Sequence, residues 1–516
     1  MNRQLRRLGI GLLACYLALF AMTNYIQVVR ARSLNDDPRN TRAIVRDFDH
    51  ARGQIVSADG QVLACTVPVT TDPAVGQVPK DGASPLDCSQ PALQVGQFQF
   101  QRMYPQRDLF GPVTGYFNFN FGATGIEKRY NEELAGQTTE QELHSLSDLF
   151  VDRDRTGDVT LTIRADLQQT AREALGDQRG SVVVLDPRDG SILALWSFPS
   201  FDPNLMSAHD SSANDVKTFL ESNGDKPLRA RTFQERFFPG STFKLVTGSV
   251  GVDSGEVTPD APSYPELSEL DLPLTTRNLS NFAGETCGGT LFEILRVSCN
   301  TSFAQMGLDL GPERMTAGAQ AFGFNDRPPI DLPAAVESAF PTDLNDQNLP
   351  ILAQSAIGQN SVQATPLQMA LVASAIANNG VIMKPHLMAQ ITDDQGDEIT
   401  SYRPEPWRQA ISAPTAAVMR DAMRGVVQNG TATRLQIDGV DVAGKTGTAQ
   451  VNPDDPNAGV EAWIVGFAGP PDGAPTVAVC VLVEAQQGFS EATGGRVAAP
   501  IARQMMEATL AAQAGG

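Results

Sequence analysis

The sequence predicts an α+β protein in which an N-terminal membrane helix precedes two folded domains. Three observations predict this: the length of 516 residues, an apolar run within the first 29 residues, and strand patterns that enclose a helical stretch in the second half. A chain this long exceeds the size at which one hydrophobic core stops growing. We expect a cytoplasmic tail with a transmembrane segment in residues 1–29, an elongated α+β domain in 30–158 and a second domain in 159–516.

A basic cluster followed by an apolar run marks the N-terminus. Arg3, Arg6 and Arg7 precede an uncharged and mostly apolar stretch at residues 8–29, which is long enough to cross a bilayer as a helix. The positive end is expected to stay in the cytoplasm, so the rest of the chain lies outside it. A cleaved signal peptide and a lipoprotein attached at Cys15 are alternative interpretations. All three place the body of the protein outside the cytoplasm.

The composition excludes some classes of function. The formal net charge is -20, from 39 Lys and Arg against 59 Asp and Glu. Such an acidic chain offers no positive surface for nucleic acid, and an anionic ligand must be held by a few local cations. No CxxC spacing and no Cys/His cluster indicates a metal site, and no cofactor is implied.

The cysteine positions indicate an oxidising compartment. One cysteine lies in the membrane segment, and another, Cys480, lies in an apolar run where a buried strand thiol is expected. The other four form two pairs that are local in sequence, Cys65 with Cys88 and Cys287 with Cys299. We expect a bridge between Cys287 and Cys299, which would contribute roughly 3 kcal/mol in the chain-entropy picture. The sequence leaves the state of Cys65 and Cys88 open.

Strand and helix patterns differ between the two expected domains. Residues 30–158 carry short alternating runs broken by turns and no visible chemistry. In the second domain, residues 180–195 predict a β-hairpin, and residues 463–468 and 476–484 predict a strand pair about a Pro/Gly turn. A sheet built from both ends, with helices from the middle, is an α+β arrangement. The main helices are expected at residues 242–251, 291–308, 366–378 and 497–511.

The first chemistry-bearing motif is Ser241-Thr242-Phe243-Lys244, which follows a Pro-Gly turn. Residues three apart share one face of a helix, so the Ser241 hydroxyl and the Lys244 amine can meet. A serine hydroxyl becomes a nucleophile when a base removes its proton, and a desolvated lysine near other cations can be that base. Ser-x-x-Lys also arises by chance, and Ser241 could be an ordinary helix N-cap.

The second motif is Ser298-Cys299-Asn300, where alternate residues can direct a hydroxyl and an amide to one site. The hydroxyl can relay a proton, and the amide can hold a substrate carbonyl or peptide N–H. Ser-x-Asn alone carries little information, because it also occurs at residues 33–35 and 212–214. The third copy is distinguished by Cys299, since a bridge to Cys287 would stiffen this corner of a site.

The third motif is Lys445-Thr446-Gly447-Thr448, whose small residues let a substrate backbone approach a strand closely. Lys445 can pair with a carboxylate, and the N–H of Thr448 can help to stabilise a tetrahedral oxyanion. The alternative is a solvated strand end that carries a lysine. Lys-Thr-Gly and Ser-x-x-Lys each occur once in the chain, which argues against coincidence.

Together and in this order, the three motifs resemble the active-site signature of the penicillin-recognising serine acyltransferases. The resemblance extends over nearly the whole chain. Arg52-Gly53-Gln54-Ile55 and Gly125-Ile126-Glu127 look like parts of the pedestal domain of class B penicillin-binding proteins. Residues 202–204, 357–368 and 377–380 are similar to the transpeptidase domain of that class. The short pedestal and the absence of an added C-terminal domain resemble the actinobacterial type A proteins.

The resemblance implies a monofunctional D,D-transpeptidase that cross-links peptidoglycan stem peptides ending in D-Ala-D-Ala, in cell division or cell shape. It implies a pedestal (dimerisation-type) domain at residues 30–158 and a transpeptidase domain at 159–516. β-Lactams are the implied covalent inhibitors, and a membrane glycan polymerase of the cell-wall machinery is the implied partner.

The resemblance also implies a role for each motif residue. Ser241 would be the nucleophile, Lys244 the base and Ser298 the proton relay to the leaving D-Ala. The backbone N–H groups of Ser241 and Thr448 would form the oxyanion hole. The remaining residues would bind the substrate: Asn300, Lys445, Thr446, Gly447 and Thr448.

Other functions stay open on the sequence alone. A D,D-carboxypeptidase would use the same first steps with water as the final acceptor, and a non-catalytic scaffold or β-lactam sensor would keep only binding. A class A β-lactamase is disfavoured, because Pro341 stands where its deacylating glutamate is expected, four residues before Asn345. The choice between division and elongation, the acceptor amine, the oligomeric state and the β-lactam affinity are not indicated by the sequence.

Overall fold

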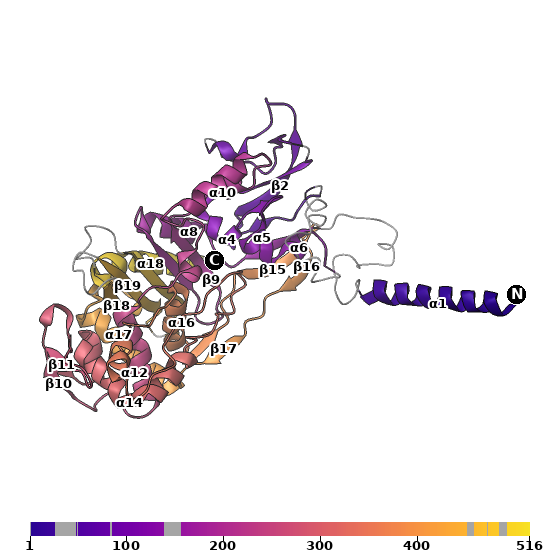
Figure 1. Ribbon diagram of the computed structural model, residues 1–516. Coiled ribbons are helices and arrows are strands. Elements are labelled where there is room, and N and C mark those ends of the chain that lie inside the picture. Colours follow the sequence, from indigo (N-terminus) through magenta and orange to yellow (C-terminus); the bar gives the residue numbers. More distant parts are fainter. Residues whose placement is uncertain are drawn as a thin grey trace.

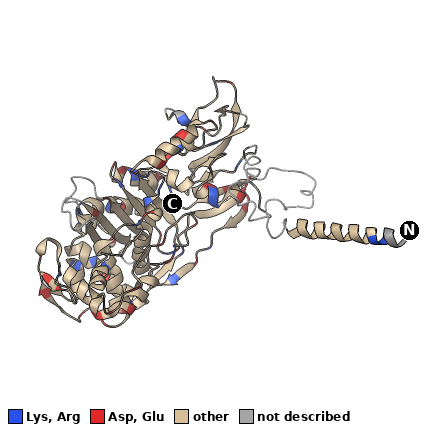
Figure 2. Ribbon diagram, in the orientation of Figure 1, with Lys and Arg blue, Asp and Glu red and all other residues tan. Residues whose placement is uncertain are grey.

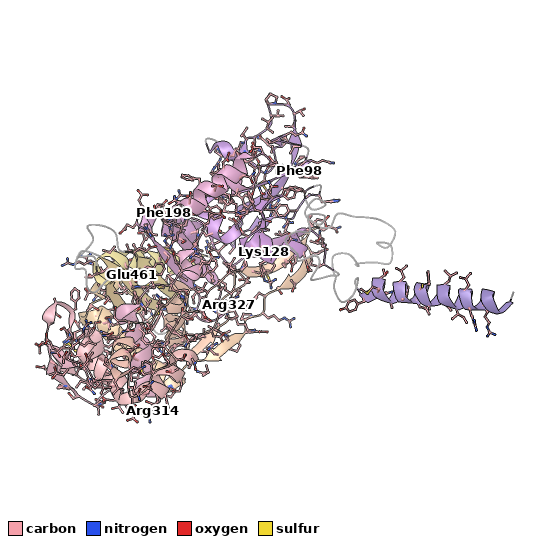
Figure 3. The ribbon with its side chains drawn as sticks, in the orientation of Figure 1. Phe98, Lys128, Phe198, Arg314, Arg327 and Glu461 are labelled. Atoms are coloured by element: carbon pink, nitrogen blue, oxygen red, sulfur yellow. A yellow bond between two sulfur atoms is a disulfide. The ribbon has the colours of Figure 1, made fainter. Side chains whose placement is uncertain are left out.

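The computed structural model describes residues 2–25, 48, 50–82, 85–96, 98–138, 156–450, 459–471, 473–484 and 493–515. It has the predicted α+β architecture, with an N-terminal helix, a mixed sheet in the N-terminal domain and an antiparallel sheet flanked by helices in the C-terminal domain (Figure 1). Phe98 of the N-terminal domain and Arg314 of the C-terminal domain lie toward opposite ends of the body (Figure 3).

Helix α1 (Asn2–Tyr25) contains the predicted membrane segment. Its 20 residues from Arg6 to Tyr25 are long and apolar enough to cross a bilayer. Its large apolar side chains are exposed, Leu8 at 63% and Leu19 at 67%, and basic residues lie near its N-terminal end (Figure 2). An apolar helix that buries nothing against the protein needs another apolar environment, which a membrane supplies. Residues 26–29 of the predicted segment lie outside the described residues.

Seven strands form a mixed sheet that joins the N-terminal domain to a later part of the chain. They are β1 (Ile55–Val56), β2 (Val62–Thr70), β3 (Ala92–Leu93), β4 (Phe100–Met103), β7 (Gly157–Leu161), β15 (Met388–Asp393) and β16 (Glu398–Ser401). Their order is β16-β15-β7-β1-β2-β3, and β4 pairs with β2. Val159 of β7 lies opposite Ile55 of β1 in parallel pairing and opposite Ile391 of β15 in antiparallel pairing. The predicted domain boundary between residues 158 and 159 falls inside β7.

Short elements complete the described part of the N-terminal domain. They are η2 (Pro79–Asp81), η3 (Arg107–Leu109), α4 (Gly111–Thr114), β5 (Phe117–Asn118), β6 (Gly122–Ala123), α5 (Gly125–Arg129) and α6 (Asn131–Leu134). A disulfide joins Cys65 of β2 to Cys88, which answers the question that the sequence left open.

A buried ion network joins two segments of the N-terminal domain, one around Arg52 and one around Glu127. Glu127 of α5 is fully buried and accepts hydrogen bonds from Arg52 Nη2 at 3.2 Å, Arg102 Nε at 2.6 Å and Tyr104 Oη at 3.2 Å. Burial alone raises the pKa of Glu127, but the charges of Arg102 and Arg52 outweigh it and hold the pKa below its usual value. The two segments that resembled a pedestal domain in the sequence, around Arg52 and Glu127, are therefore in direct contact.

A five-stranded antiparallel sheet forms the centre of the C-terminal domain. Its strands are β8 (Gly180–Leu185), β9 (Ile192–Phe198), β18 (Asp441–Gln450), β19 (Val460–Gly469) and β20 (Val477–Val483), in the order β18-β19-β20-β8-β9. The predicted hairpin and the predicted strand pair are both present. All seven residues of β20 are buried, so helices cover both faces of the sheet.

Helices from both ends and from the middle of this domain pack directly on the sheet. Helix α8 (Ala165–Leu175) and helix α18 (Ala499–Gly515) pack on each other and on the sheet, and α16 (Pro366–Ala377) packs on β8, β19 and β20. Every residue of α16 is buried, as its apolar sequence predicts. Thr365 caps its N-terminus by accepting the N–H of Gln368, with Pro366 as the first helical residue.

The remaining helices form a group at one edge of the sheet, beside β18. They are η4 (Gly240–Phe243), α12 (Lys244–Asp253), α13 (Leu291–Arg296), α14 (Asn300–Ala321), α15 (Leu349–Ser355) and α17 (Ala413–Asn429). The continuous helix expected at residues 291–308 was wrong, because the chain leaves the helix after Arg296 and begins a new one at Asn300. Between them Ser298 has a φ of 63°, which a right-handed helix does not accommodate.

The other described elements are short and lie mainly in connections. They are α9 (Pro203–Met206), α10 (Ser212–Ser222), α11 (Arg231–Gln234), β10 (Tyr264–Leu267), β11 (Glu269–Asp271), β12 (Asn278–Ser280), η5 (Phe282–Gly284), β13 (Cys287–Gly289), β14 (Val381–Met383), β17 (Pro406–Gln409), η6 (Thr433–Leu435) and the π-helical turn η7 (Gly494–Ala498). Strands β10 to β13 form two small ladders that lie against α14.

Replacing Glu127 with Gln should lower the free energy of unfolding by about 3–5 kcal/mol, because it leaves Arg52 and Arg102 buried without their counter-charge. Chemical denaturation of the purified protein in detergent measures the change. Glu132→Gln is the matched control, since Glu132 is an exposed glutamate of the neighbouring α6. Equal stability of the two variants would show that the network does not hold this domain together.

Candidate active site

Ser241 and Lys244 meet because the chain forms a 3₁₀ turn at this point. Side chains three residues apart eclipse each other in such a turn, and Lys244 Nζ lies 3.0 Å from Ser241 Oγ. Gly240 enters the turn with a φ of 52°, and a Cβ at this position would lie 3.0 Å from the carbonyl oxygen of Thr448. Both the conformation and the close approach therefore require glycine immediately before the serine.

Ser298 and Asn300 lie at the break between α13 and α14. Lys244 Nζ donates hydrogen bonds to the Ser298 carbonyl oxygen at 2.7 Å and to Asn300 Oδ1 at 2.6 Å. The same amine lies 3.3 Å from Ser298 Oγ. The break between the helices thus directs Ser298 and Asn300 at the Lys244 amine.

Strand β18 brings the third motif to the same place. Lys445 Nζ donates hydrogen bonds to Ser298 Oγ at 2.7 Å and to the Thr446 carbonyl oxygen at 2.9 Å. A Cβ on Gly447 would lie 2.8 Å from Thr242 Cγ2, so glycine lets this strand lie directly against turn η4. The structure brings together all the predicted site residues: Ser241, Lys244, Ser298, Asn300, Lys445, Thr446, Gly447 and Thr448.

The two lysine amines are buried close to each other, and both lysine residues have 0% exposure. Burial, together with the charge of Lys445, lowers the pKa of Lys244 well below its usual value. Burial lowers the pKa of Lys445 to about 7. Among the described residues, no carboxylate forms an ion pair with either amine. Both effects favour the neutral form of the Lys244 amine, the form that can accept a proton.

In the third motif Thr448 is partly exposed, whereas Lys445 and Thr446 are buried. The sequence predicted that Lys445 could receive a carboxylate, but its amine is buried and directed at Ser298. Thr446 Oγ1 lies 2.7 Å from Thr431 Oγ1, and Thr448 is partly exposed, as is Ser241. The hydroxyl of the partly exposed Thr448 can donate to an anionic group while the buried lysine charge attracts that group.

Cys299, in the middle of the second motif, forms a disulfide with Cys287 of β13. The two Cα atoms lie 5.8 Å apart, and the bridge closes a loop with a sequence separation of 12 residues. The bridge attaches the small ladders of residues 264–289 to the start of α14. The bridge therefore limits how far Ser298 and Asn300 can move relative to those ladders.

Three residues near the motifs were not predicted from the sequence: Asn281, Thr431 and Glu461. Asn281 accepts the backbone N–H groups at the start of α14. Glu461, labelled in Figure 3, lies on β19 and accepts the N–H of Phe238 through Oε2 at 2.9 Å. Burial raises the pKa of Glu461 to about 8. No motif spacing marks these residues, because each acts from a segment that meets the site only in the folded chain.

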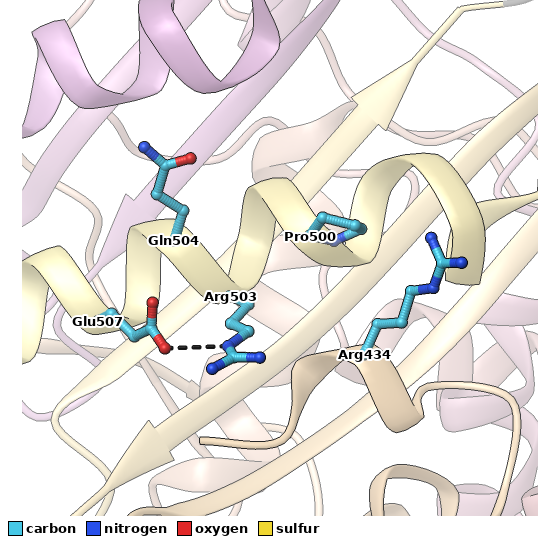
Figure 4. A pocket seen from close by; sticks show the side chains of 5 residues that line it. All are labelled: Arg434, Pro500, Arg503, Gln504 and Glu507. Carbon is cyan, nitrogen blue, oxygen red and sulfur yellow. Dashed lines mark hydrogen bonds and ion pairs between the residues drawn. The ribbon is translucent and has the colours of Figure 1, made fainter. Parts of the chain in front are cut away.

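A pocket between η6 and α18 is separate from this site (Figure 4). It shares no residue with the three motifs and is lined by Arg434, Pro500, Arg503, Gln504 and Glu507. Arg503 Nε is already paired with Glu507 Oε1 at 2.9 Å. Within the described ranges, no group of three or more His, Cys, Asp or Glu residues is arranged to hold a metal ion.

Known penicillin-binding proteins match this chain over nearly its whole length. Residues 180–507 match the family described as the penicillin binding protein transpeptidase domain, and residues 76–159 match the penicillin binding protein A dimerisation domain. The peptidoglycan D,D-transpeptidase PbpA of Mycolicibacterium smegmatis is 37% identical over 526 residues, which cover 99% of each chain. The PbpA of Mycobacterium tuberculosis is 34% identical over 525 residues, with the same coverage.

Solved structures of relatives show the same fold. A structure of penicillin-binding protein A from M. tuberculosis, determined as a ceftriaxone acyl-enzyme complex, superimposes with a TM-score of 0.79. It is 32% identical in sequence, and the match covers 90% of this chain and 100% of that one. With its three motifs assembled around Ser241 and its whole length matched by relatives of this kind, the chain belongs to the class B penicillin-binding proteins, the family of penicillin-binding transpeptidases.

Proposed function

We propose that the protein is a peptidoglycan D,D-transpeptidase that cross-links stem peptides ending in D-Ala-D-Ala through an acyl-enzyme on Ser241. The observation that carries the proposal is the hydrogen bond of 3.0 Å between Lys244 Nζ and Ser241 Oγ, made by an amine whose pKa burial lowers well below its usual value. A neutral amine at hydrogen-bond distance from a hydroxyl is the arrangement that general-base activation of a nucleophile requires.

The proposed acylation step begins when Ser241 Oγ attacks the carbonyl carbon of the penultimate D-Ala. Lys244 Nζ takes the hydroxyl proton and passes it through Ser298 Oγ to the nitrogen of the terminal D-Ala. The peptide C–N bond then breaks, D-Ala leaves as a neutral amine, and an ester to Ser241 remains. The contacts of Lys244 and Lys445 with Ser298 Oγ, at 3.3 and 2.7 Å, support this route for the proton.

Two backbone N–H groups, of Ser241 and Thr448, are proposed to stabilise the tetrahedral oxyanion. The close packing of Gly240 against Thr448 supports this, because it places β18 beside the nucleophile turn. Asn300 would orient the peptide through its amide. Lys445, Thr446, Gly447 and Thr448 would receive the substrate backbone and its terminal carboxylate, with the charge of Lys445 acting from below the surface.

The second half of the reaction decides between a transpeptidase and a carboxypeptidase. In transpeptidation, the amine of a second stem peptide attacks the ester and gives its proton to Lys244, which returns the proton to Ser241 Oγ as the C–O bond breaks. In a D,D-carboxypeptidase, water takes the place of that amine. We favour transpeptidation because relatives matched over their full length bear that name. A β-lactam would acylate Ser241 by the same first step, as the acyl-enzyme complex of the M. tuberculosis relative illustrates.

Membrane attachment through α1 fits a substrate that is assembled at the membrane. We propose that α1 crosses the cell membrane once with its basic end in the cytoplasm. The catalytic domain would then lie outside the cytoplasm, beside a membrane glycan polymerase that makes the strands to be cross-linked.

Ser241→Ala should abolish covalent labelling by a fluorescent penicillin, with a loss on the order of 10³-fold or more in the acylation rate. Ser254→Ala is the control, because Ser254 is an exposed serine just after α12 and lies outside the site. Mass spectrometry of products from a synthetic stem peptide with an acceptor amine then separates transpeptidation from hydrolysis. Full complementation of a deletion strain by Ser241→Ala would instead favour the scaffold or sensor function.

Lys445→Gln should move the acid limb of the acylation rate to higher pH. The charge of Lys445 helps to lower the pKa of Lys244, so removing that charge raises the pKa. Lys244 is proposed to work as a neutral base, so acylation slows when its amine becomes protonated. With a raised pKa, this protonation occurs at a higher pH. Lys384→Gln, which removes a partly exposed lysine paired with Glu405, should leave the profile unchanged. An unshifted limb in Lys445→Gln would exclude this electrostatic role.

Protease added outside intact spheroplasts should digest the body of the protein while an epitope tag fused before Met1 stays protected, because the basic end of α1 is retained in the cytoplasm. Lysed spheroplasts are the control, in which the tag must also be digested. A tag that is digested in intact spheroplasts would contradict the proposed orientation.

A further inference from the structure

Helix α14 begins at the catalytic motif without a capping side chain of its own. The first N–H groups of a helix have no partner within it and are usually satisfied by the side chain of the residue at the N-cap. At α14 the N-cap is Cys299, whose side chain makes no capping hydrogen bond and is bonded to Cys287. The backbone of Asn300 therefore needs a partner from elsewhere in the chain.

That partner is Asn281, which lies just after β12. Asn281 Oδ1 accepts the N–H groups of Asn300 and Thr301, both at 2.9 Å. Asn281 Nδ2 donates to the carbonyl oxygens of Leu267 at 2.7 Å and Glu285 at 2.9 Å. With its oxygen and nitrogen each holding two partners and only 7% of the residue exposed, the amide has one orientation that satisfies all four groups.

The residue before Asn281 orients the catalytic side chain itself. Asn300 Nδ2 donates to the Ser280 carbonyl oxygen at 3.1 Å. This leaves Asn300 Oδ1 directed at Lys244 Nζ, 2.6 Å away. The two-residue segment 280–281 thus holds both the backbone and the side chain of Asn300, and the ladder of β11 and β12 in turn holds that segment.

From this geometry we propose that Asn281 is a positioning residue of the acylation step, which acts by fixing Asn300 against Lys244 and the substrate. The proposal rests on the proposed function of the three motifs. Asn281 makes no contact with the reacting hydroxyl, so its effect must pass through Asn300. A displacement of about 1 Å in a substrate-orienting group can cost up to a hundredfold in rate.

A double-mutant cycle on the full-length protein tests this proposal. Asn281→Ala, Asn300→Ala and the double variant are compared with wild type by the second-order rate constant for acylation by a fluorescent penicillin. We expect Asn281→Ala to lower the rate constant about tenfold to a hundredfold, and the double variant to match Asn300→Ala within about twofold. Multiplicative losses in the double variant would overturn the proposal, because Asn281 would then act independently of Asn300.

The pH profile gives a readout that a merely structural role would not change. Asn300 Oδ1 accepts a hydrogen bond from the Lys244 amine and so favours its charged form, while Lys445 is the charged side chain that faces this amine. Loosening Asn300 should therefore lower the pKa of Lys244 and move the acid limb of acylation to lower pH, by the same amount in Asn281→Ala and Asn300→Ala. An acid limb that moves in Asn300→Ala but stays in place in Asn281→Ala would count against positioning.

Asn278→Ala is the matched control. Asn278 lies on β12, just before Asn281 in the chain, and is exposed. Among the described residues its side chain bonds only Glu269, so this variant should acylate at the wild-type rate. If Asn281→Ala does not fold, as judged by thermal melting, the cycle is repeated with Asn281→Asp, which keeps an acceptor for both N–H groups but loses both donor bonds. Non-additivity with Asn300→Ala then supports the proposal and additivity overturns it.

Ser241→Ala separates the two proposals. If Ser241→Ala is still acylated, the proposed function fails. If it is not acylated but the Asn281 and Asn300 losses multiply, only the positioning role fails.

Discussion

The hydroxyl of Ser298 lies between two buried lysine amines, 2.7 Å from Lys445 and 3.3 Å from Lys244. Two ammonium groups this close, away from water and without a carboxylate among the described residues, disfavour each other strongly. Burial and the charge of Lys445 accordingly lower the pKa of Lys244 well below its usual value, and burial lowers the pKa of Lys445 to about 7. The proposed role of Lys244 depends on this, because a charged Lys244 could not accept the proton of Ser241.

The fold supports this arrangement by fixing three segments that are far apart in sequence. The 3₁₀ turn η4 sets the distance between Ser241 and Lys244, the break before α14 turns the second motif toward the amine, and β18 lies against the turn at Gly447. Ser298 has a left-handed backbone conformation, which costs free energy in a residue with a side chain. The disulfide at Cys299 and the capping of α14 by Asn281 hold that conformation in place.

Much of the central sheet could be predicted because its signals are local. The hairpin at residues 180–195 and the strands near the C-terminus show continuous apolar runs of strand length, and α16 shows the apolar composition of a buried helix. The three motifs could be located because each is a short pattern of reactive residue types. Their roles follow from the resemblance and stay proposals.

What could not be predicted depends on contacts between distant segments. The break between α13 and α14 falls within a helical pattern, and its cause is the left-handed conformation of Ser298 in a folded environment that no local propensity describes. Asn281 resembles any polar residue near a turn until Asn300 is brought to it. The burial of Lys445 was likewise hidden, since a lysine in a Lys-Thr-Gly strand is as compatible with an exposed position.

The mixed sheet has a consequence for how the molecule can be divided. Its strands β15 and β16 come from residues 388–401, yet they pair with β7, which pairs with β1. The hydrophobic core is likewise continuous from Ile55 to Trp463. Cutting the polypeptide near residue 158 would split β7 and leave β15 as an unpaired edge, a surface prone to self-association. We therefore expect both halves to unfold together, and a fragment for crystallography or inhibitor screening is best obtained by removing α1 alone.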